Sequence, residues 1–431
     1  MSIAVEKELP KGWSSCKIDD VCKIIRGITF PKTAKTTEKL NDHIPCLRTT
    51  NVQESTDWKN LIYIPSKYVK DESKLVKISD ILISNSNSLD LVGKVSYVDQ
   101  IIKNSTFGGF ITIIRSHSCD SKYLFYQLRS SQIKNYFRGI ASTTTNISNI
   151  STSKIADTEI FLPPLNEQKR IVAKIEELFS LIDSAKDTLE KTQVLLKQYR
   201  QSILKHAFEG KLTAEWRENN QLSFVTLKHV TNIIMGQSPS GESYNNNGDG
   251  VPLLNGPTEF GNKFPTEIQW TTSPTKICKT NDLLFCVRGN TIGRMNWADK
   301  EYCIGRGLCA INSRNNMNIQ LVFYFLSLKG LEIRLSGSGS TFPSISKASL
   351  ENFKIPLFSN TEQESLLSKI EENFLLIEKN EKIVDQLLLQ CNQIKNSILK
   401  QAFEGKLVPQ DPNDEPAEIL LQRIREEKNG K

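Results

Sequence analysis

A ten-residue phrase occurs twice in this chain, and the repeat constrains the fold more than any other feature of the sequence. One copy, ILKHAFEGKL, ends at Leu212, and the other, ILKQAFEGKL, ends at Leu407. When the comparison is extended backwards at the same offset, residues 166–212 align without a gap with residues 361–407, and 20 of the 47 positions are identical. Identity of this extent indicates a duplicated unit.

Fainter similarities join segments outside this unit. They occur in the same chain order in both halves: residues 17–27 resemble 227–236, 44–47 resemble 251–254, 80–84 resemble 282–286, 91–99 resemble 291–299, and 107–110 resemble 304–307. The spacing between partners drifts, as it does where loops have diverged. The chain is therefore interpreted as two copies of one module, a globular domain followed by a long helix.

The duplicated unit has the period of a coiled-coil helix, with seam positions in alternating steps of four and three. The predicted seam begins Ile171, Ile175, Leu178, Ile182, Ala185 and ends Tyr199, Ile203, His206 in the first copy; in the second it begins Leu366, Ile370, Asn373, Ile377, Asn380 and ends Ile394, Ile398, Gln401. Each copy predicts a helix of about 43 residues, or roughly 65 Å.

The expected ends of these helices follow from residues with known terminal preferences. Pro163 and Pro164 stop any helix before the first copy, and Asn166 and Thr361 are predicted N-caps. Gly210 and Gly405 stand where a C′ glycine ends a helix. Asn373 and Asn380 are polar seam residues, which more often set the register of a coiled coil than carry chemistry.

The connectivity predicts how the helices pair. The first helix carries the chain away from the first domain, so the second helix can bury its seam against the first only by running back. We expect an α+β protein: two homologous globular domains separated by two long helices that form an antiparallel coiled coil, with pseudo-two-fold symmetry. The expected segments are residues 1–165, 166–212, 213–358, 359–407 and 408–431, the last containing a tail helix.

No sequence motif for catalysis or metal binding is present in the sequence. It lacks a phosphate-binding P-loop, a dinucleotide fingerprint, a nucleophile elbow and a zinc-protease helix. The nine cysteines include no Cys-x-x-Cys pair and the four histidines have no metal-ligand spacing from them. We therefore expect a recognition or scaffold protein without enzymatic activity. The absence of a long apolar run or signal segment predicts a cytoplasmic protein without a membrane span.

Charge and loop composition favour nucleic acid as the partner. Residues 1–165 and 223–358 carry net charges of +6 and +4, whereas residues 166–222 and 359–431 carry +1 and −4. Polar loops in the two basic segments contain side chains suited to base edges and phosphates. The candidates for DNA contact are Arg26, Arg48, Asn51, Lys94, Gln237, Arg288, Asn290 and Arg294. Each loop taken alone also fits an ordinary turn.

Two related but different domains on a rigid spacer would read two short sequences on one DNA duplex with a constant unread gap. At this point several motifs resemble one family: LPKGW at 9–13, PLNEQKRIV at 164–172, the repeated phrase, and the tail from 411. Over essentially the whole chain they resemble the specificity subunit of type I restriction-modification systems. The opening FSNTEQ at 358–363 departs from the Pro-Leu-x-Glu-Gln pattern of the family.

The resemblance implies two target-recognition domains and conserved helices that space them and dock two DNA-adenine methyltransferase subunits, with restriction subunits joining the assembly. It implies no cofactor in this chain, and S-adenosylmethionine, ATP and magnesium on the partner subunits. The expected docking residues are Phe208, Gly210, Phe403 and Gly405 at the helix ends, with Leu420 and Ile424 in the tail. The alternatives are that these residues only terminate helices, and that the chain is a free-standing DNA-binding or scaffold protein.

Overall fold

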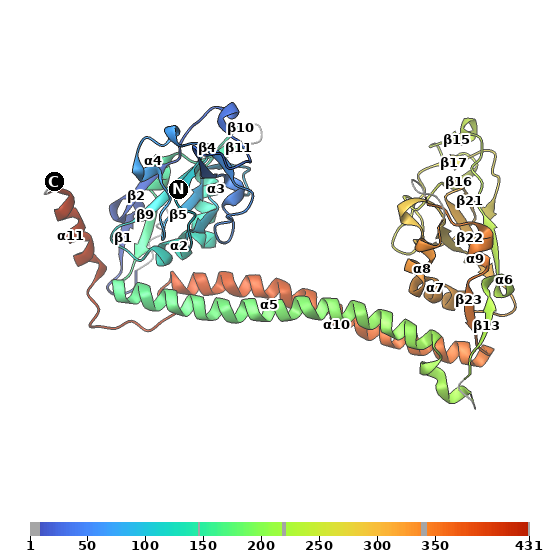
Figure 1. Ribbon diagram of the computed structural model, residues 1–431. Coiled ribbons are helices and arrows are strands. Elements are labelled where there is room, and N and C mark those ends of the chain that lie inside the picture. The colour runs from blue at the N-terminus through green and yellow to red at the C-terminus, as the bar shows by residue number, and fades with distance from the viewer. Residues whose placement is uncertain (1–8, 145–146, 218–220, 338–342, 430–431) are drawn as a thin grey trace. The chain divides into compact units, whose positions relative to one another are not determined.

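The computed structural model describes residues 9–144, 147–217, 221–337 and 343–429. Its contacts divide the chain into two units, residues 1–188 with 387–431 and residues 189–386. Within each unit a globular domain packs against a pair of helix segments (Figure 1). Both long helices therefore contribute to both units, and each unit is described separately below.

The first unit is built on a four-stranded antiparallel sheet in the order β2-β9-β5-β7. These strands are Cys22–Arg26, Ile111–Ser116, Ile81–Ser84 and Val95–Tyr97. The four residues of β5 are buried on both faces. Ile81 and Ile83 pack toward the helices, whereas Leu82 packs in the second core cluster between the sheets. The continuous apolar run of β5 is thus explained by burial on both sides.

A second sheet of the first unit has the order β4-β3-β8, with strands Ile62–Pro65, His43–Leu47 and Thr106–Phe107. Helices α2 (Ser121–Arg129) and α3 (Ser131–Ile140) pack against the main sheet. The sequence predicts one helix across this segment, but Ser130 divides it. The hydroxyl of Ser130 accepts a hydrogen bond from the N–H of Ile133 and so begins a new helix.

The second unit repeats this plan. Its main sheet has the order β14-β22-β19-β20, with strands Thr231–Met235, Leu308–Ser313, Leu283–Cys286 and Met295–Trp297. The second sheet has the order β15-β17-β16-β21-β18, with strands Tyr244–Asn245, Trp270–Thr271, Val251–Leu254, Tyr302–Ile304 and Ile277–Cys278. Helices α7 (Ile319–Leu328) and α8 (Gly330–Leu335) correspond to α2 and α3. The predicted α+β class and its duplication are confirmed.

Short elements complete both units. Two-stranded sheets join the start of each domain to the strand that leads into a long helix: β1 (Ser14–Lys17) with β12 (Glu159–Leu162), and β13 (Ser223–Thr226) with β23 (Lys354–Leu357). The remaining helices and strands are α1 (Ile18–Val21), α4 (Thr152–Ala156), α6 (Leu227–Val230), α9 (Lys347–Glu351), β6 (Ser86–Asn87), β10 (Ser142–Thr144) and β11 (Ile147–Asn149).

The long helices are α5 (Leu165–Phe208) and α10 (Asn360–Ala402). The predicted terminal glycines are confirmed, because Gly210 and Gly405 adopt left-handed φ angles of 72° and 70°. The predicted N-caps Asn166 and Thr361 are wrong, since both helices begin earlier. At α10 the hydroxyl of Ser359 accepts a hydrogen bond from the N–H of Glu362, so Ser359 is the capping residue.

The two helices run antiparallel within each unit, as predicted. In the first unit Lys395 Nζ lies 2.5 Å from the carboxylate of Asp183. In the second unit Gln193 Nε2 lies 2.6 Å from Asp385, and Arg200 pairs with Glu381 at 3.5 Å. Residue numbers in α10 fall as those in α5 rise, which only an antiparallel arrangement produces.

Half of the predicted seam is wrong by one residue. The series Ile370, Ile377, Val384, Cys391 and Ile398 is buried as expected. Of the alternate positions in α10, Leu366 is buried as predicted. From Asn373 onward each predicted residue is more exposed than the residue that follows it: Phe374 is 9% exposed, whereas Ile394 is 48% exposed. Arg200 lies over the Phe374 ring and Lys395 over the Phe179 ring, with the cation 4.5 and 5.0 Å from the ring centroid.

This register has a physical reason. Steps of three and four fit the sequence in either order, and the observed order gains cation–π contacts and cross-helix ion pairs. It also corrects the role expected of Asn380, which is exposed and lies outside the seam. Asn373 donates a hydrogen bond to the backbone oxygen of Lys369 in its own helix and accepts one from the hydroxyl of Tyr199 in α5 at 3.5 Å.

The tail forms helix α11 (Ala417–Asn429), which packs on the first unit. The N–H of Ala417 donates to the oxygen of Gly12 at 2.9 Å, and Leu421 and Ile424 are buried. Arg170 in α5 forms an ion pair with Asp414 at 2.6 Å just before this helix. None of the helices in the described parts of the chain is long and apolar enough to cross a membrane.

Candidate nucleic-acid interface

The candidate interface lies at one end of the main sheet in each unit. Adjacent strands run in opposite directions, so the end of β2, the start of β9, the end of β5 and the start of β7 meet at the same edge. In the first unit we call residues 26–30, 84–94 and 108–110 the first loop end. In the second unit residues 235–240, 287–294 and 305–307 form the second loop end.

The first loop end brings together two of the four candidates in its unit. Arg26 is exposed at the end of β2, and Lys94 precedes β7. Lys94 is half-buried, and its ammonium donates a hydrogen bond to the side chain of Gln53. Burial lowers the pKa of Lys94 below its ordinary value. Arg26 is thus the more accessible cation.

The structure gives Arg48 and Asn51 another role. Asn51 is 2% exposed, and its amide donates to the backbone oxygens of Asp57 and Lys59 while accepting from the N–H of Arg48. Arg48 donates through Nη2 to the backbone oxygen of Asn60 at 2.9 Å. Both side chains therefore hold the loop after β3 together. With its amide fully engaged, Asn51 is not available to a base.

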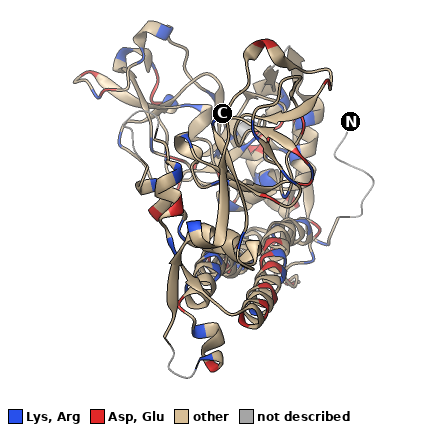
Figure 2. Cartoon of the chain, turned by 90° about the vertical axis from the view of Figure 1, so that its right-hand side faces the viewer, with Lys and Arg blue, Asp and Glu red and all other residues tan. Residues whose placement is uncertain are grey.

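The second loop end brings together all four candidates in its unit. Gln237, Arg288, Asn290 and Arg294 are exposed. Arg288 and Arg294 have no carboxylate within 4.0 Å in the parts of the chain that the structure describes. Lys and Arg residues occur on the loops, and they are interleaved with Asp and Glu along the long helices (Figure 2). Unpaired guanidinium groups on loops are suited to phosphates and guanine edges.

Of the expected docking residues at the helix ends, Phe208, Gly210 and Phe403 are buried in their own units and Gly405 is half-buried. Phe208 packs edge-on against Phe325 with ring centroids 5.4 Å apart, and Phe403 packs edge-on against Tyr123 at 5.5 Å. A Cβ on Gly405 would lie 2.4 Å from Pro10, so this glycine allows close packing as well as the left-handed turn. The repeated phrase therefore anchors each helix end to a domain.

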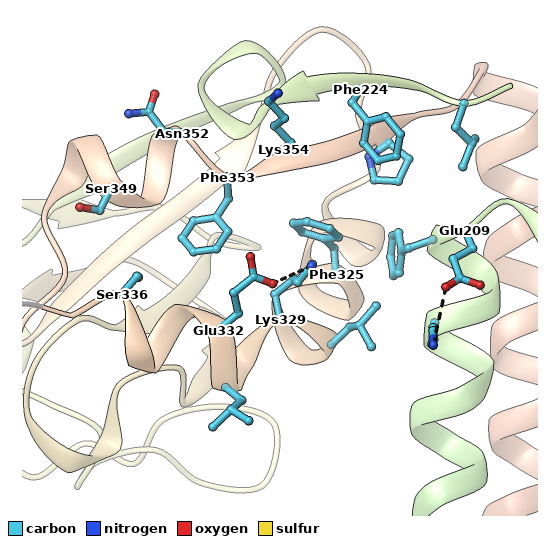
Figure 3. A pocket seen from close by; sticks show the side chains of 16 residues that line it. Glu209, Phe224, Phe325, Lys329, Glu332, Ser336, Ser349, Asn352, Phe353 and Lys354 are labelled. Carbon is cyan, nitrogen blue, oxygen red and sulfur yellow. Dashed lines mark hydrogen bonds and ion pairs between the residues drawn. The ribbon is translucent and has the colours of Figure 1, made fainter.

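A hollow adjoins each anchored end. In the second unit it has a volume of about 1260 Å³ and is lined by Phe208 together with Phe224, Phe325 and Phe353. Charged pairs lie at its edge: Lys329 with Glu332 at 2.6 Å and Lys205 with Glu209 at 3.9 Å (Figure 3). In the first unit the hollow beside Phe403 is about 340 Å³, and the residues that line it include Ser130, Ser131 and Gln132.

The repeated Glu-Gln at the start of each long helix joins the helix to its domain. Gln168 donates to the oxygen of Pro163 and accepts from the N–H of Asp120, both at 2.8 Å. Gln363 makes the same pair of bonds with Phe358 and Asn318, at 3.1 and 2.7 Å. Each glutamine thus links the entry strand to the cap of α2 or α7. Sequence reasoning treated these residues only as part of the repeat.

The neighbouring glutamates are also buried. Trp13 Nε1 donates to Glu167 at 3.0 Å, and burial raises the pKa of Glu167 above its ordinary value. Glu362 accepts from the hydroxyl of Thr213 at 2.7 Å and pairs with Arg217. Among the described residues no three His, Cys, Asp or Glu side chains are grouped to hold a metal ion.

Two exposed residues of the loop ends are not among the candidates predicted from the sequence. Phe110 and Arg306 lie in the turns before β9 and β22, at neighbouring positions of equivalent turns. The similarity of residues 107–110 to 304–307 was the signal that could have found them. By itself this similarity indicates only duplication, because neither turn resembles a known nucleic-acid motif.

Comparison with protein families gives a match over most of the chain. A family model described as the type I restriction modification DNA specificity domain matches twice, at residues 10–193 and 219–389. The two matched segments correspond to the two copies found within the sequence.

Individual relatives agree with this match. The chain is 31% identical over 411 residues to the MjaX type I restriction enzyme specificity subunit of Methanocaldococcus jannaschii, covering 93% of this chain and 95% of the relative. It is 25% identical to the EcoKI specificity subunit of Escherichia coli K12, covering 98% and 96%.

Solved structures share the fold. The HsdS subunit from Thermoanaerobacter tengcongensis matches with a TM-score of 0.63 and 24% identity, over 94% of this chain and 99% of that chain. A chain from a study of complex assembly and conformational transition of the type I R-M system matches with a TM-score of 0.72 and 24% identity, over 93% and 100%.

Proposed function

Because the chain belongs to the family of type I restriction-modification DNA specificity proteins, we propose that it is the non-catalytic subunit that reads a bipartite DNA target. The target would consist of two short half-sites separated by a fixed unread spacer. Residues 1–165 and 213–358 would be the recognition domains, residues 166–212 and 359–407 the spacer helices, and residues 408–431 the tail.

The observation that carries this proposal is the pair of loop ends. Both are built on the same strand order, yet they present different exposed residues: Arg26 in one, and Gln237, Arg288 and Arg294 in the other. Equivalent scaffolds with different contact residues are what two different half-sites require.

We also propose that two methyltransferase subunits dock along the helices and at their ends. The corrected seam leaves large apolar side chains exposed: Leu181, Leu387 and Ile394 in the first unit, and Leu195, Leu376 and Ile383 in the second. Exposed apolar groups that recur along a helix favour a helical partner. The hollows beside Phe208 and Phe403 supply two related places at the helix ends.

The tail belongs to the same proposal. Ile424 is buried against the first unit, whereas Leu420 is only half-buried and remains accessible to a partner. Restriction subunits would join the assembly through the methyltransferase subunits, and S-adenosylmethionine, ATP and magnesium would act there. A subunit that reads chromosomal DNA would work in the cytoplasm.

Target reading is tested by co-expressing this chain with the methyltransferase subunit of its own system and mapping methylated adenines across a genome by single-molecule sequencing. We expect one motif made of two short half-sites with a constant gap. A single contiguous motif would show that one domain is not a reader. No methylation, despite a stable complex, would favour the scaffold alternative.

Docking is tested by replacing Leu376 and Ile383 together with serine and measuring co-purification with the methyltransferase subunit. We expect at least a tenfold weaker complex, because both side chains are exposed in the free chain and would be buried by the partner. Replacing the exposed Glu378 and Lys382 of α10 by alanine is the matched control, because both lie on another side of the helix. Equal binding by all three proteins would refute docking on this face.

A further inference from the structure

A pair of glycines sets the position of the turn before β9 and of its counterpart before β22. A Cβ on Gly27 would lie 2.1 Å from the oxygen of Gly108, and one on Gly236 would lie 2.2 Å from the oxygen of Gly305. The N–H groups of Gly27 and Gly236 donate to Ile111 and Leu308 at 3.0 and 2.9 Å. Backbone lies directly on backbone in both units, so the two turns have the same support.

A second backbone hydrogen bond joins each turn to the loop that follows β5 or β19. The N–H of Asn85 donates to the oxygen of Phe110 at 3.1 Å, and the N–H of Val287 donates to the oxygen of Gly307 at 3.0 Å. These bonds make Phe110 equivalent to Gly307, and therefore Gly109 equivalent to Arg306. The two turns share these backbone contacts but carry different side chains.

The side chains that differ are the accessible ones. Phe110 is 66% exposed, which makes it the most exposed aromatic residue in the described parts of the chain. Arg306 is exposed, and no carboxylate of the described residues lies within 4.0 Å of its guanidinium. The residues that follow Asn85 and Val287 also differ between the units. Ser86 pairs with Asn149 in the first unit, whereas the equivalent Arg288 pairs with Ser344 in the second.

We infer that these turns enter a groove of the DNA duplex, and that Phe110 and Arg306 give the two domains different base preferences. The inference rests on the proposed function and deepens it. A phenyl ring has no hydrogen-bonding group, so at a major-groove base edge it makes an apolar contact with the methyl group of thymine. A guanidinium is suited to the O6 and N7 acceptors of guanine.

The rigid backbone support of the two turns is the reason why each side chain can select one base. A side chain on a mobile loop could adapt to several bases, whereas a turn held at two backbone contacts presents its side chain from one place. Phe110 therefore assigns a T·A pair to the half-site of the first domain. Arg306 assigns a G·C pair to the half-site of the second, and Arg288 supplies a further cation in that domain.

The test is selection from a library of randomised DNA duplexes, using the full chain in complex with its methyltransferase subunit. The Phe110→Ala variant should lose the thymine preference at one position of one half-site and leave the other half-site unchanged. The Arg306→Ala variant should lose a guanine preference in the other half-site only. On the duplex selected by the unmodified chain, each variant should bind about 5- to 150-fold more weakly.

Matched controls come from the opposite end of the same sheets. Ile78 is an exposed apolar residue before β5, and Arg314 is an exposed cation after β22. The Ile78→Ala and Arg314→Ala variants should select the original motif with unchanged preference at every position. Thermal unfolding of all four variants checks that none has lost its fold.

The outcomes separate the inference from the proposed function. If the unmodified chain selects a split motif and Phe110→Ala and Arg306→Ala select the same motif with equal affinity, the turns are not readers. If both variants lose preference in the same half-site, the assignment of a separate half-site to each turn is wrong. If the unmodified chain selects no motif, the proposed function itself fails.

Discussion

Gln168 accepts a hydrogen bond from the backbone N–H of Asp120 at 2.8 Å, across 48 residues of sequence. The bond joins the first turn of α5 to the cap of α2, and its counterpart in the second unit joins Gln363 to Asn318. Because the same glutamine also bonds the strand that enters the helix, one side chain fixes three elements.

Replacing Gln168 by alanine should lower the free energy of unfolding of the first unit by about 1–3 kcal/mol, because two backbone groups lose their partner inside the protein. Urea unfolding followed by circular dichroism measures this loss. The Gln198→Ala variant, at an exposed position of the same helix, is the control and should stay within about 0.5 kcal/mol of the original. Equal losses would contradict the special role of Gln168.

The observed seam predicts a contrast within α10. Phe374→Ala should lower the stability by about 3–5 kcal/mol, because it removes a buried ring from the core of the second unit. Ile394→Ala should change the stability by no more than about 0.5 kcal/mol, because its side chain faces solvent. The predicted seam reverses this order, so thermal unfolding of the two variants decides between the registers.

Glu167 should make stability depend on pH. Burial raises its pKa in the folded chain, so the folded state holds this proton more tightly than the unfolded state does. The free energy of unfolding contributed by this group therefore falls as pH rises from the ordinary glutamate pKa through the raised value. The penalty is absent below the ordinary pKa, where both states are protonated.

The Glu167→Gln variant removes this titration and keeps an acceptor for Trp13. Its stability relative to the original chain should increase with pH across that window and then level off, as measured by urea unfolding at a series of pH values. Trp13→Phe should increase the dependence on pH, because the indole bond opposes the effect of burial. A pH-independent difference for Glu167→Gln would contradict the prediction.

The close contact between Gly27 and Gly108 predicts that a substitution can weaken DNA binding without removing a side chain that contacts DNA. Gly27→Ala should destabilise the first unit by about 1–3 kcal/mol, because the added methyl group overlaps the backbone of Gly108. It should also weaken DNA binding. Gly139→Ala is the control: nothing lies within 4 Å of its Cβ position in α3, so stability should rise by up to about 1 kcal/mol.

Salt should weaken DNA binding steeply. If several exposed Arg and Lys residues contact phosphates, log affinity falls linearly with log salt concentration, by about 0.9 for each phosphate contact on duplex DNA. Fluorescence anisotropy of a labelled duplex, titrated with the complex between 50 and 200 mM salt, measures the slope. A slope near zero would mean that the basic loops do not contact the phosphate backbone.

The architecture could be predicted from the sequence because the repeat relates segments that lie far apart in the chain. A gap-free alignment of two helices fixes their length, and the connectivity leaves the second helix one direction in which to pair. The sequence did not predict the seam fully, because steps of four and three suit both Asn373 and Phe374 as the alternate position. Contacts of Arg200 with Phe374 and Glu381 decide between them, and these depend on the partner helix.

The exposure of the candidate contact residues was predicted only in part, for a related reason. Composition identifies side chains that can contact DNA, but it does not say which of them are used inside the protein. Asn51 matched the preference of asparagine for adenine, yet three backbone groups of its own loop occupy its amide. Phe110 was overlooked because an aromatic residue is expected in a core, and only the structure places it at a supported, exposed turn.

Near its two ends the helix pair has no core separate from that of the adjoining domain. The buried residues of α5 and α10 near each end belong to the core of the adjoining domain: Ile171 and Ile398 to one cluster, Ile203 and Ile370 to the other. The middle of the pair, around Val384 and Cys391, belongs to neither. Cooperative unfolding should therefore stop halfway along the helices, so that one globular domain and its half of the helix pair can melt and refold while the other stays native.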